Sequence, residues 1–119
     1  MEERMNRSKY LPLTETTFYI LIALLEPGHG YVIMQKVEEL SEGSVRIAAG
    51  TMYGAIENLL KLKWIESVPG NDKRRKVYQI TEDGRVVLEE ETQRLRGLVS
   101  IADKYISPAE CPSQVKRGA

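Results

Sequence analysis

The sequence predicts a small, mainly helical domain with one β-hairpin and a long helix near its C-terminal end. Three observations predict this fold class. Apolar residues recur at helical spacing in three consecutive segments, two β-prone segments separated by turn-forming residues follow, and a narrow apolar seam runs along the next segment. The chain has 119 residues, of which 42% are hydrophobic, so it should form one domain whose modest core invites support from a partner chain.

The composition excludes several classes of protein. A single cysteine, Cys111, excludes a disulfide scaffold and a cysteine-rich metal site. The longest apolar run, Phe18 to Leu25, is far shorter than the roughly 20 residues of a membrane-spanning helix, and acidic residues before it argue against a secretory signal. His29 has no cysteine or acidic partner at ligand spacing. We therefore expect a cytoplasmic protein with no membrane contact, no metal and no cofactor.

Charge is distributed unevenly along a chain whose formal net charge is zero. Residues 41–80 contain seven basic and four acidic residues, a net charge of plus three, and the rest of the chain carries minus three. A basic middle third between acidic ends indicates a localised phosphate-binding surface. The seven basic residues are Arg46, Lys61, Lys63, Lys73, Arg74, Arg75 and Lys76.

The first predicted helix covers residues 14–25 and ends at the turn Glu-Pro-Gly-His-Gly of residues 26–30. Every residue from Phe18 to Leu25 is apolar, so this helix has no solvent-facing side and must be covered from more than one direction. We expect a second subunit to supply part of that cover. The second predicted helix, residues 31–41, is amphipathic, with an apolar stripe of Ile33, Met34, Val37 and Leu40.

A loop containing glycine leads to the third predicted helix, for which Thr51 is the expected N-cap. The core face of this helix consists of Met52, Ala55, Ile56, Leu59 and Leu60. The opposite face is made of small, hydrogen-bonding or charged side chains, with Tyr53 at its boundary. This face is suited to lie against another polar surface, and it comprises Thr51, Gly54, Glu57, Asn58 and Lys61.

Two β-prone segments, Trp64 to Val68 and Lys76 to Ile80, predict a hairpin whose exposed tip, residues 69–75, is basic. The last helix is expected to begin after an N-cap at Thr81 and to end near Ile106. Its seam has nearly heptad spacing, is interrupted by Glu91 and Thr92, and is typical of a helix that packs against another helix. The seam residues are Leu88, Leu95, Leu98, Val99, Ala102, Tyr105 and Ile106.

Three helices, a basic hairpin and a long helix occur in the order of a winged helix-turn-helix, in which the third helix can enter the major groove of DNA. Five short motifs then resemble the PadR family of bacterial transcriptional regulators, over roughly residues 10–106. The motifs are Leu13-Thr14-Glu15, His29-Gly30-Tyr31, Gly50-Thr51-Met52-Tyr53, Trp64-Ile65 and the segment of residues 74–84.

This resemblance implies a homodimeric DNA-binding protein, usually a repressor, in which one C-terminal helix forms the dimer in the subgroup with short tails. It also implies that a small hydrophobic or phenolic effector releases some members from DNA. We accordingly expect a polar arm at residues 1–12, a winged helix-turn-helix at 13–80, a dimerisation helix at 81–106 and a disordered tail at 107–119. Double-stranded DNA with a pseudo-palindromic operator and a second copy of the chain are the expected partners.

The expected DNA-binding residues lie in the turn before the third helix, on its polar face and at the hairpin tip. They are Arg46, Thr51, Tyr53, Gly54, Asn58, Lys61, Lys73, Arg74, Arg75 and Lys76. In isolation, a basic run such as Lys73 to Lys76 is more often a solvated turn, and residues such as Asn58 and Lys61 are more often plain surface residues. Their place in a winged helix-turn-helix favours DNA contact instead. Tyr53 fits a core-edge aromatic equally well. Phe18 and the seam residues of the last helix are expected at the dimer interface, where Phe18, Leu95 and Val99 could also enclose an effector.

Two other function classes, a protein-binding adaptor and an enzyme, are the alternatives to a DNA-binding regulator. A winged-helix adaptor that binds an acidic protein would need the same basic surface, because fold does not determine function. An enzyme would need a nucleophile motif, a phosphate-cradling glycine loop or paired catalytic carboxylates, and the sequence presents none of these. A DNA-binding regulator is therefore the favoured interpretation, with the adaptor as its alternative.

Overall fold

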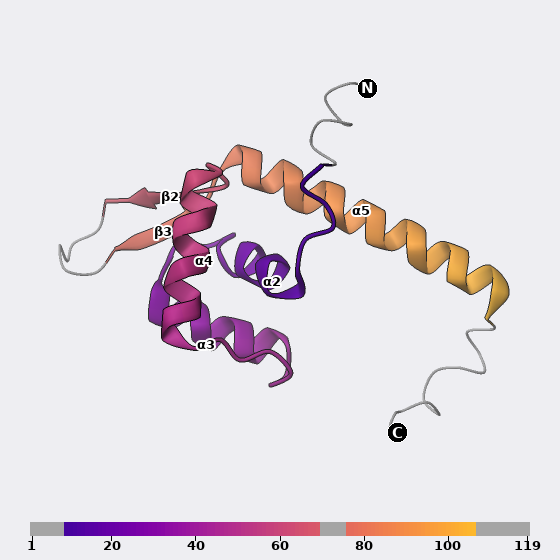
Figure 1. Cartoon of the computed structure of the whole chain (residues 1–119), viewed down its shortest axis with the longest axis horizontal. Coiled ribbons are helices and arrows are strands. Elements are labelled where there is room, and N and C mark those ends of the chain that lie inside the picture. The colour runs from indigo at the N-terminus through magenta and orange to yellow at the C-terminus, as the bar shows by residue number, and fades with distance from the viewer. Residues whose placement is uncertain (1–8, 70–75, 107–119) are drawn as a thin grey trace.

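The computed structural model describes residues 9–69 and 76–106. Helices α2, α3 and α4 and a small sheet gather at one end of the molecule, and helix α5 extends away from them (Figure 1). This is the mainly helical winged-helix architecture that the sequence predicts. The elements in chain order are α2 (Glu15–Ala23), β1 (Gly28–His29), α3 (Gly30–Leu40), α4 (Ala49–Lys61), β2 (Ile65–Val68), β3 (Val77–Ile80) and α5 (Glu82–Tyr105).

Helix α2 lies at the centre of the core. Thr14 caps it by accepting a hydrogen bond from the amide of Thr17 at 3.0 Å. The helix packs against α3 on one side and α5 on another, and its buried residues are continuous with those of every other helix. The fully or nearly fully buried apolar side chains are Ile20, Leu21, Ala23, Leu24, Ile33, Val37, Ile47, Met52, Ile56, Leu59, Trp64, Ile65, Tyr78, Ile80, Val87 and Leu88.

The sheet is antiparallel with strand order β1-β3-β2. Strands β2 and β3 form the predicted hairpin, in register from Ile65 opposite Ile80 to Val68 opposite Val77. Strand β1 was not predicted, because its two residues lie in a segment whose composition indicates a turn. It pairs Gly28 with Tyr78, so its strand character comes from a partner distant in the sequence.

The junction between the hairpin and α5 is tightly packed. Thr81 is the N-cap, as predicted: its hydroxyl accepts from the amide of Gly84 at 3.0 Å and donates to the carbonyl of Lys63 at 2.7 Å. A Cβ atom on Gly84 would lie 2.2 Å from the carbonyl oxygen of Trp64 and 2.7 Å from Cγ1 of Ile80. The first turn of α5 therefore approaches the backbone of the sheet as closely as only glycine allows.

Glu91 differs most from its sequence-based interpretation. We expected it to interrupt the seam as a surface residue, but its side chain is buried, with 2% of the residue exposed. Its Oε2 accepts a hydrogen bond from the amide of Leu13 at 3.2 Å, and the guanidinium of Arg94 donates to both carboxylate oxygens at 2.7 and 2.9 Å. The bonds from Arg94 hold the pKa of Glu91 below its usual range, although burial acts in the opposite direction. This carboxylate ties the segment before α2 to α5.

Three other expectations were wrong. Leu40 was placed on the apolar stripe of α3 but is exposed, because α3 ends there and the chain turns away from the core. Thr51 is not an N-cap: α4 begins two residues earlier, after Ala48. Leu88 was grouped with the exposed seam of α5 but is buried in the core of its own chain.

The expected disorder of residues 107–119, most of the polar arm at 1–12 and Cys111 lie outside the described residues. Over residues 9–69 and 76–106, no helix is both long enough and apolar enough to cross a membrane.

Replacing Gly84 by alanine should lower the free energy of unfolding by about 3 kcal/mol, because the new methyl group meets backbone that can move only if the hairpin shifts. Denaturant unfolding measures this change. Gly54→Ala is the matched control: it adds the same methyl group to a helix where nothing lies within 4 Å, and it should raise the free energy of unfolding by about 0.5–1 kcal/mol. Equal effects of the two variants would contradict the close approach at Gly84.

Glu91→Gln should lower the free energy of unfolding by about 2 kcal/mol at neutral pH. The glutamine amide is neutral and has only one acceptor oxygen, so it cannot accept both hydrogen bonds from the Arg94 guanidinium. Since the folded state lowers the pKa of Glu91, its contribution is present above the pKa of the unfolded chain and is lost as the pH falls through the depressed value. The variant should therefore lose less stability than the wild type between about pH 6 and pH 3. Urea unfolding at several pH values measures how the free energy of unfolding of the wild type and of the variant depends on pH.

The control for this measurement is Glu39→Gln, which neutralises an exposed glutamate of α3. It should leave the pH dependence of the wild type unchanged. If Glu91→Gln also kept the wild-type pH dependence, the ion pair would not contribute to folding.

Candidate nucleic-acid interface

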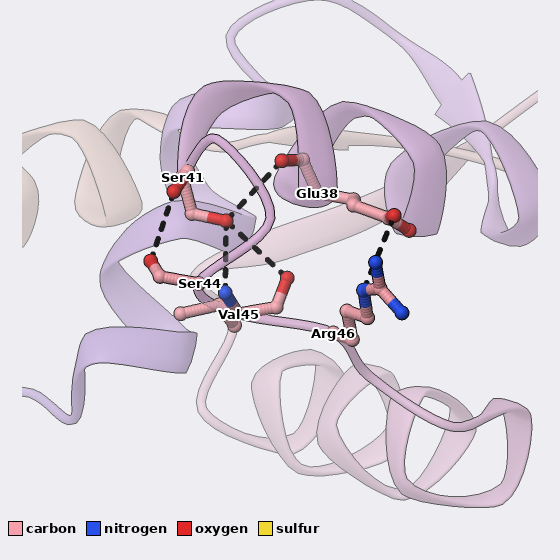
Figure 2. A network of polar contacts seen from close by, with 5 residues as sticks. All are labelled: Glu38, Ser41, Ser44, Val45 and Arg46. Carbon is pink, nitrogen blue, oxygen red and sulfur yellow. Dashed lines mark hydrogen bonds and ion pairs between the residues drawn. The ribbon is translucent and has the colours of Figure 1, made fainter.

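The turn between α3 and α4 is held by a buried serine (Figure 2). The hydroxyl of Ser41 accepts a hydrogen bond from the amide of Val45 at 3.0 Å and lies 3.3 Å from the carbonyl oxygens of Glu38 and Val45, to either of which it can donate. The hydroxyl of Ser44 donates to the carbonyl of Ser41 at 2.9 Å. Gly43 has a φ of +84°, which a residue with a side chain rarely adopts. These contacts define the angle at which α4 leaves α3.

Arg46 lies in the same turn, just before α4. Its Nε is 3.3 Å from Oε2 of Glu38, and its side chain is 75% exposed (Figure 2). An ion pair this exposed contributes little to stability, because water and salt screen it. The guanidinium can therefore exchange this carboxylate for another anion at small cost.

Helix α4 presents the predicted polar face to solvent. Met52, Ile56 and Leu59 are buried, while Thr51, Tyr53, Gly54, Glu57, Asn58 and Lys61 are all exposed. Gly50 belongs to the glycine-containing segment expected as a loop before the third helix, but it lies in the first turn of α4 and on the same face. Nothing lies within 4 Å of the position that a Cβ atom would occupy on Gly50 or Gly54, so packing within the chain does not require glycine at either.

Tyr53 connects α4 to the start of α3. A Cβ atom on Gly30 would lie 3.0 Å from both Cε1 and the hydroxyl oxygen of Tyr53, so the ring rests directly on this glycine. The residue is nevertheless 54% exposed. The pKa of Tyr78 on β3 is raised mainly by burial and in addition by Tyr53. One side of the Tyr53 ring thus packs against the domain, as expected of a core-edge residue. Its other side is exposed to solvent near the N-terminus of α3, where the helix dipole favours an anion.

The wing, which is the hairpin of β2 and β3, contributes Lys76 from within the described residues. Lys76, at the start of β3, is exposed, and its carbonyl oxygen lies 3.4 Å from Nδ1 of His29 on β1. Lys73, Arg74 and Arg75 lie outside the described residues. Lys63, which adopts a φ of +65° in the turn after α4, is a further exposed cation near the hairpin.

The expected dimer residues divide into two groups. Phe18 and Leu88 are taken up by the core of their own chain, Phe18 partly and Leu88 fully. The remainder lie exposed on the second half of α5, where Ile101, not predicted, joins them because it lies beside the seam. This exposed seam consists of Leu95, Leu98, Val99, Ile101, Ala102, Tyr105 and Ile106.

Two hollows border α5. A groove of about 1110 Å³ lies between its first half, the end of α2 and the segment of Leu11 and Pro12, with Ile22 and Leu25 on its apolar side. A shallower hollow along α5 is lined by Leu95 and Val99, and Phe18 does not line it. A single chain therefore does not bring Phe18, Leu95 and Val99 together around one cavity. Within the described part of the chain, no group of three histidine, cysteine or acidic residues could hold a metal ion.

Comparisons with known proteins agree with this geometry. Residues 20–90 match the model of the transcriptional regulator PadR-like family. An uncharacterized protein of Lysinibacillus sphaericus is 30% identical over 95 residues, which cover 76% of this chain and 87% of that protein.

Solved structures share the fold. A transcriptional regulator from Clostridium thermocellum is 25% identical, with a TM-score of 0.66 over 76% of this chain and 89% of that chain. A PadR family transcriptional regulator from Eggerthella lenta is 24% identical, with a TM-score of 0.62 over 87% of this chain and 88% of the other. The Bordetella bronchiseptica protein BpsR, whose DNA binding is regulated by 6-hydroxynicotinic acid, is 22% identical, with a TM-score of 0.62 over 92% of this chain and 82% of its own.

Proposed function

The chain belongs to the PadR-like family of transcriptional regulators, and we propose that it acts as a homodimeric repressor that binds a pseudo-palindromic DNA operator. The observation that carries this proposal is the exposed polar face of α4. A helix of 13 residues is about 20 Å long, and its polar side can lie in a major groove about 12 Å wide. Thr51 and Asn58 supply hydrogen-bonding groups there, and Lys61 supplies a cation.

Contacts to phosphates would come from both sides of α4. Arg46 precedes the helix and holds only an exposed carboxylate, which phosphate oxygens can replace. Tyr53 offers its hydroxyl beside the N-terminus of α3. On the wing, Lys76 and the basic residues Lys73, Arg74 and Arg75 complete the set that would position the duplex without reading its sequence.

The small residues of α4 support a close approach to DNA. Gly54 is exposed in the middle of the helix, where glycine costs about 1 kcal/mol relative to alanine. Among residues 9–69 and 76–106, no contact explains this cost. A major-groove surface that meets the helix backbone at this point would explain it, because a methyl group would hold the two surfaces apart.

Dimerisation is supported by apolar surface that one chain leaves uncovered. Helix α5 has 24 residues and is about 36 Å long, yet its buried residues all lie in its first half. On the second half, Leu98 is 52% exposed and Tyr105 is 84% exposed. Exposed apolar patches of this kind mark association surfaces. We assign residues 81–106 to a dimerisation helix and residues 13–80 to the DNA-binding unit, although the first turns of α5 share the core of that unit.

The groove beside the first half of α5 is the proposed seat of the partner's helix. It is lined on one side by Leu11, Ile22 and Leu25, and Leu25 is exposed in the single chain. In a dimer with a twofold axis, the apolar seam of the partner's α5 would lie in this groove, and the seam of this chain's α5 would lie in the partner's groove. The cover that α2 lacks would then come from the partner.

An effector site would have to be completed by both copies. Leu95 and Val99 line an open hollow on α5, and the partner's helix would close it. We propose that a small hydrophobic molecule held there shifts the spacing of the two α4 helices and releases DNA. Regulation of the fold neighbour BpsR by an aromatic acid is consistent with this arrangement.

DNA binding is tested by fluorescence anisotropy with the duplex upstream of the protein's own gene and with a scrambled duplex, at several salt concentrations. We expect at least a thousandfold preference for the native duplex. Replacing Lys73, Arg74, Arg75 and Lys76 by alanine should weaken binding to every duplex and reduce the slope of log affinity against log salt by about 3–4, because each lost phosphate contact releases about one counterion fewer.

Gly54→Ala and Asn58→Ala separate base reading from phosphate binding in this experiment. Both should reduce the preference for the native duplex by about tenfold or more while the salt slope stays that of the wild type. Glu39→Ala, on an exposed part of α3, is the control and should change neither quantity. Weak and equal binding of the wild type to both duplexes, and to duplexes selected from a random pool, would contradict the proposal and favour a protein-binding adaptor.

Leu98→Glu should dissociate the dimer, because it places an unpaired carboxylate in an apolar interface on each copy. We expect the dissociation constant to rise by at least a hundredfold, measured by sedimentation equilibrium. Gly97→Glu adds the same group on an exposed side of α5 away from the apolar seam and from both hollows, and it should leave the association unchanged. A wild-type chain that sediments as a monomer at micromolar concentration would contradict the dimer.

A further inference from the structure

One acidic residue occupies the middle of the face that is proposed to meet DNA. Gly50, Gly54, Glu57 and Lys61 follow one another at spacings of four, three and four residues, so they form a single row along α4. This row lies opposite the buried side of the helix. Because its first two members have no side chain, a surface that approaches the row closely meets Glu57 as the first long side chain.

Glu57 is exposed and has no ion pair or hydrogen bond within the described parts of the chain. Two other exposed glutamates are paired: Glu26 with Lys36 at 3.1 Å, and Glu38 with Arg46 at 3.3 Å. Lys61 lies four residues after Glu57, which is the favourable order for an ion pair on a helix, yet the two do not pair. The carboxylate is therefore free to accept a hydrogen bond from outside the chain.

A free carboxylate on a DNA-facing surface has a definite chemical preference. It is repelled by phosphates, so it weakens binding to any duplex that offers it no donor. It can only accept hydrogen bonds. In the major groove, cytosine presents an amino donor at N4, whereas adenine presents its amino group next to the acceptor N7, which repels a carboxylate. Cytosine is thus the base that best satisfies Glu57.

We propose that Glu57 is a specificity-determining residue that accepts a hydrogen bond from the N4 amino group of a cytosine in each operator half-site, and that it disfavours duplexes lacking that cytosine. This inference rests on the proposed function, since it assigns a base to one position of the same interface. Asn58 lies beside this row and Lys61 is its last member, and each would contact its own base or phosphate independently of Glu57.

The test is selection of duplexes from a random pool by the full-length wild type and by Glu57→Ala and Glu57→Gln, followed by affinity measurements on the selected sites. The wild type should select a cytosine at one position of each half-site. Glu57→Ala should lose the preference at that position alone, by about tenfold, and should bind unrelated DNA more tightly. Glu57→Gln should select adenine there, because a glutamine amide pairs with both N6 and N7 of that base.

Glu39→Ala removes an equal charge from α3 and should select the same sites as the wild type. Circular dichroism should show all three variants to be folded like the wild type, since each position is exposed. If Glu57→Ala and the wild type selected identical sites, the inference would be overturned while the proposed function stood. If the wild type itself selected no sequence, both would fall.

Discussion

The need to cover α2 determines most of this structure. From Phe18 onward this helix is apolar on every side, so that part cannot lie on the surface of a domain. Helix α3 covers one side and the first half of α5 another, and the sheet is attached at its end, where the amide of Ile80 donates to the carbonyl of Leu24 at 2.9 Å. Helix α4 packs mainly against α3 and β2, with its polar face outward. The position of the candidate DNA-binding face is in this sense a consequence of how the central helix is buried.

The same requirement explains why α5 extends beyond the domain. Only its first half is needed to cover α2, and there Glu91 and Arg94 add a polar contact that holds Leu13 against the helix. The second half has apolar residues that the described residues, 9–69 and 76–106, leave exposed. In Figure 1 this half lies away from α4 and the wing, so the two outward surfaces are separate. One surface is polar and suited to DNA, and the other is apolar and suited to a second chain.

Local pattern was sufficient to predict the helices, the hairpin and the polar face of α4, because helical periodicity and N-cap chemistry depend on residues a few positions apart. The features that were missed depend on partners distant in the sequence. Strand β1 exists because β3 lies beside it, and Glu91 is buried because Leu13 and Arg94 satisfy its oxygens. The start of α4 was misplaced because Thr51 has good capping chemistry, whereas the helix begins after Ala48, whose side chain makes no capping hydrogen bond.

The glycines of α4 and of α5 show how one residue type can reflect opposite constraints. At Gly84 the surrounding backbone excludes a side chain, so glycine is needed for α5 to pack this closely against the hairpin. At Gly50 and Gly54 the space is open, and alanine would favour the helix. A residue that lowers stability without serving the fold is typical of a functional surface. The row that begins with these two glycines continues through Glu57 and Lys61. One end of the row therefore has no side chains, and the other end has charged side chains that do not pair with each other. Both features make sense when the row faces a surface that comes from outside the chain.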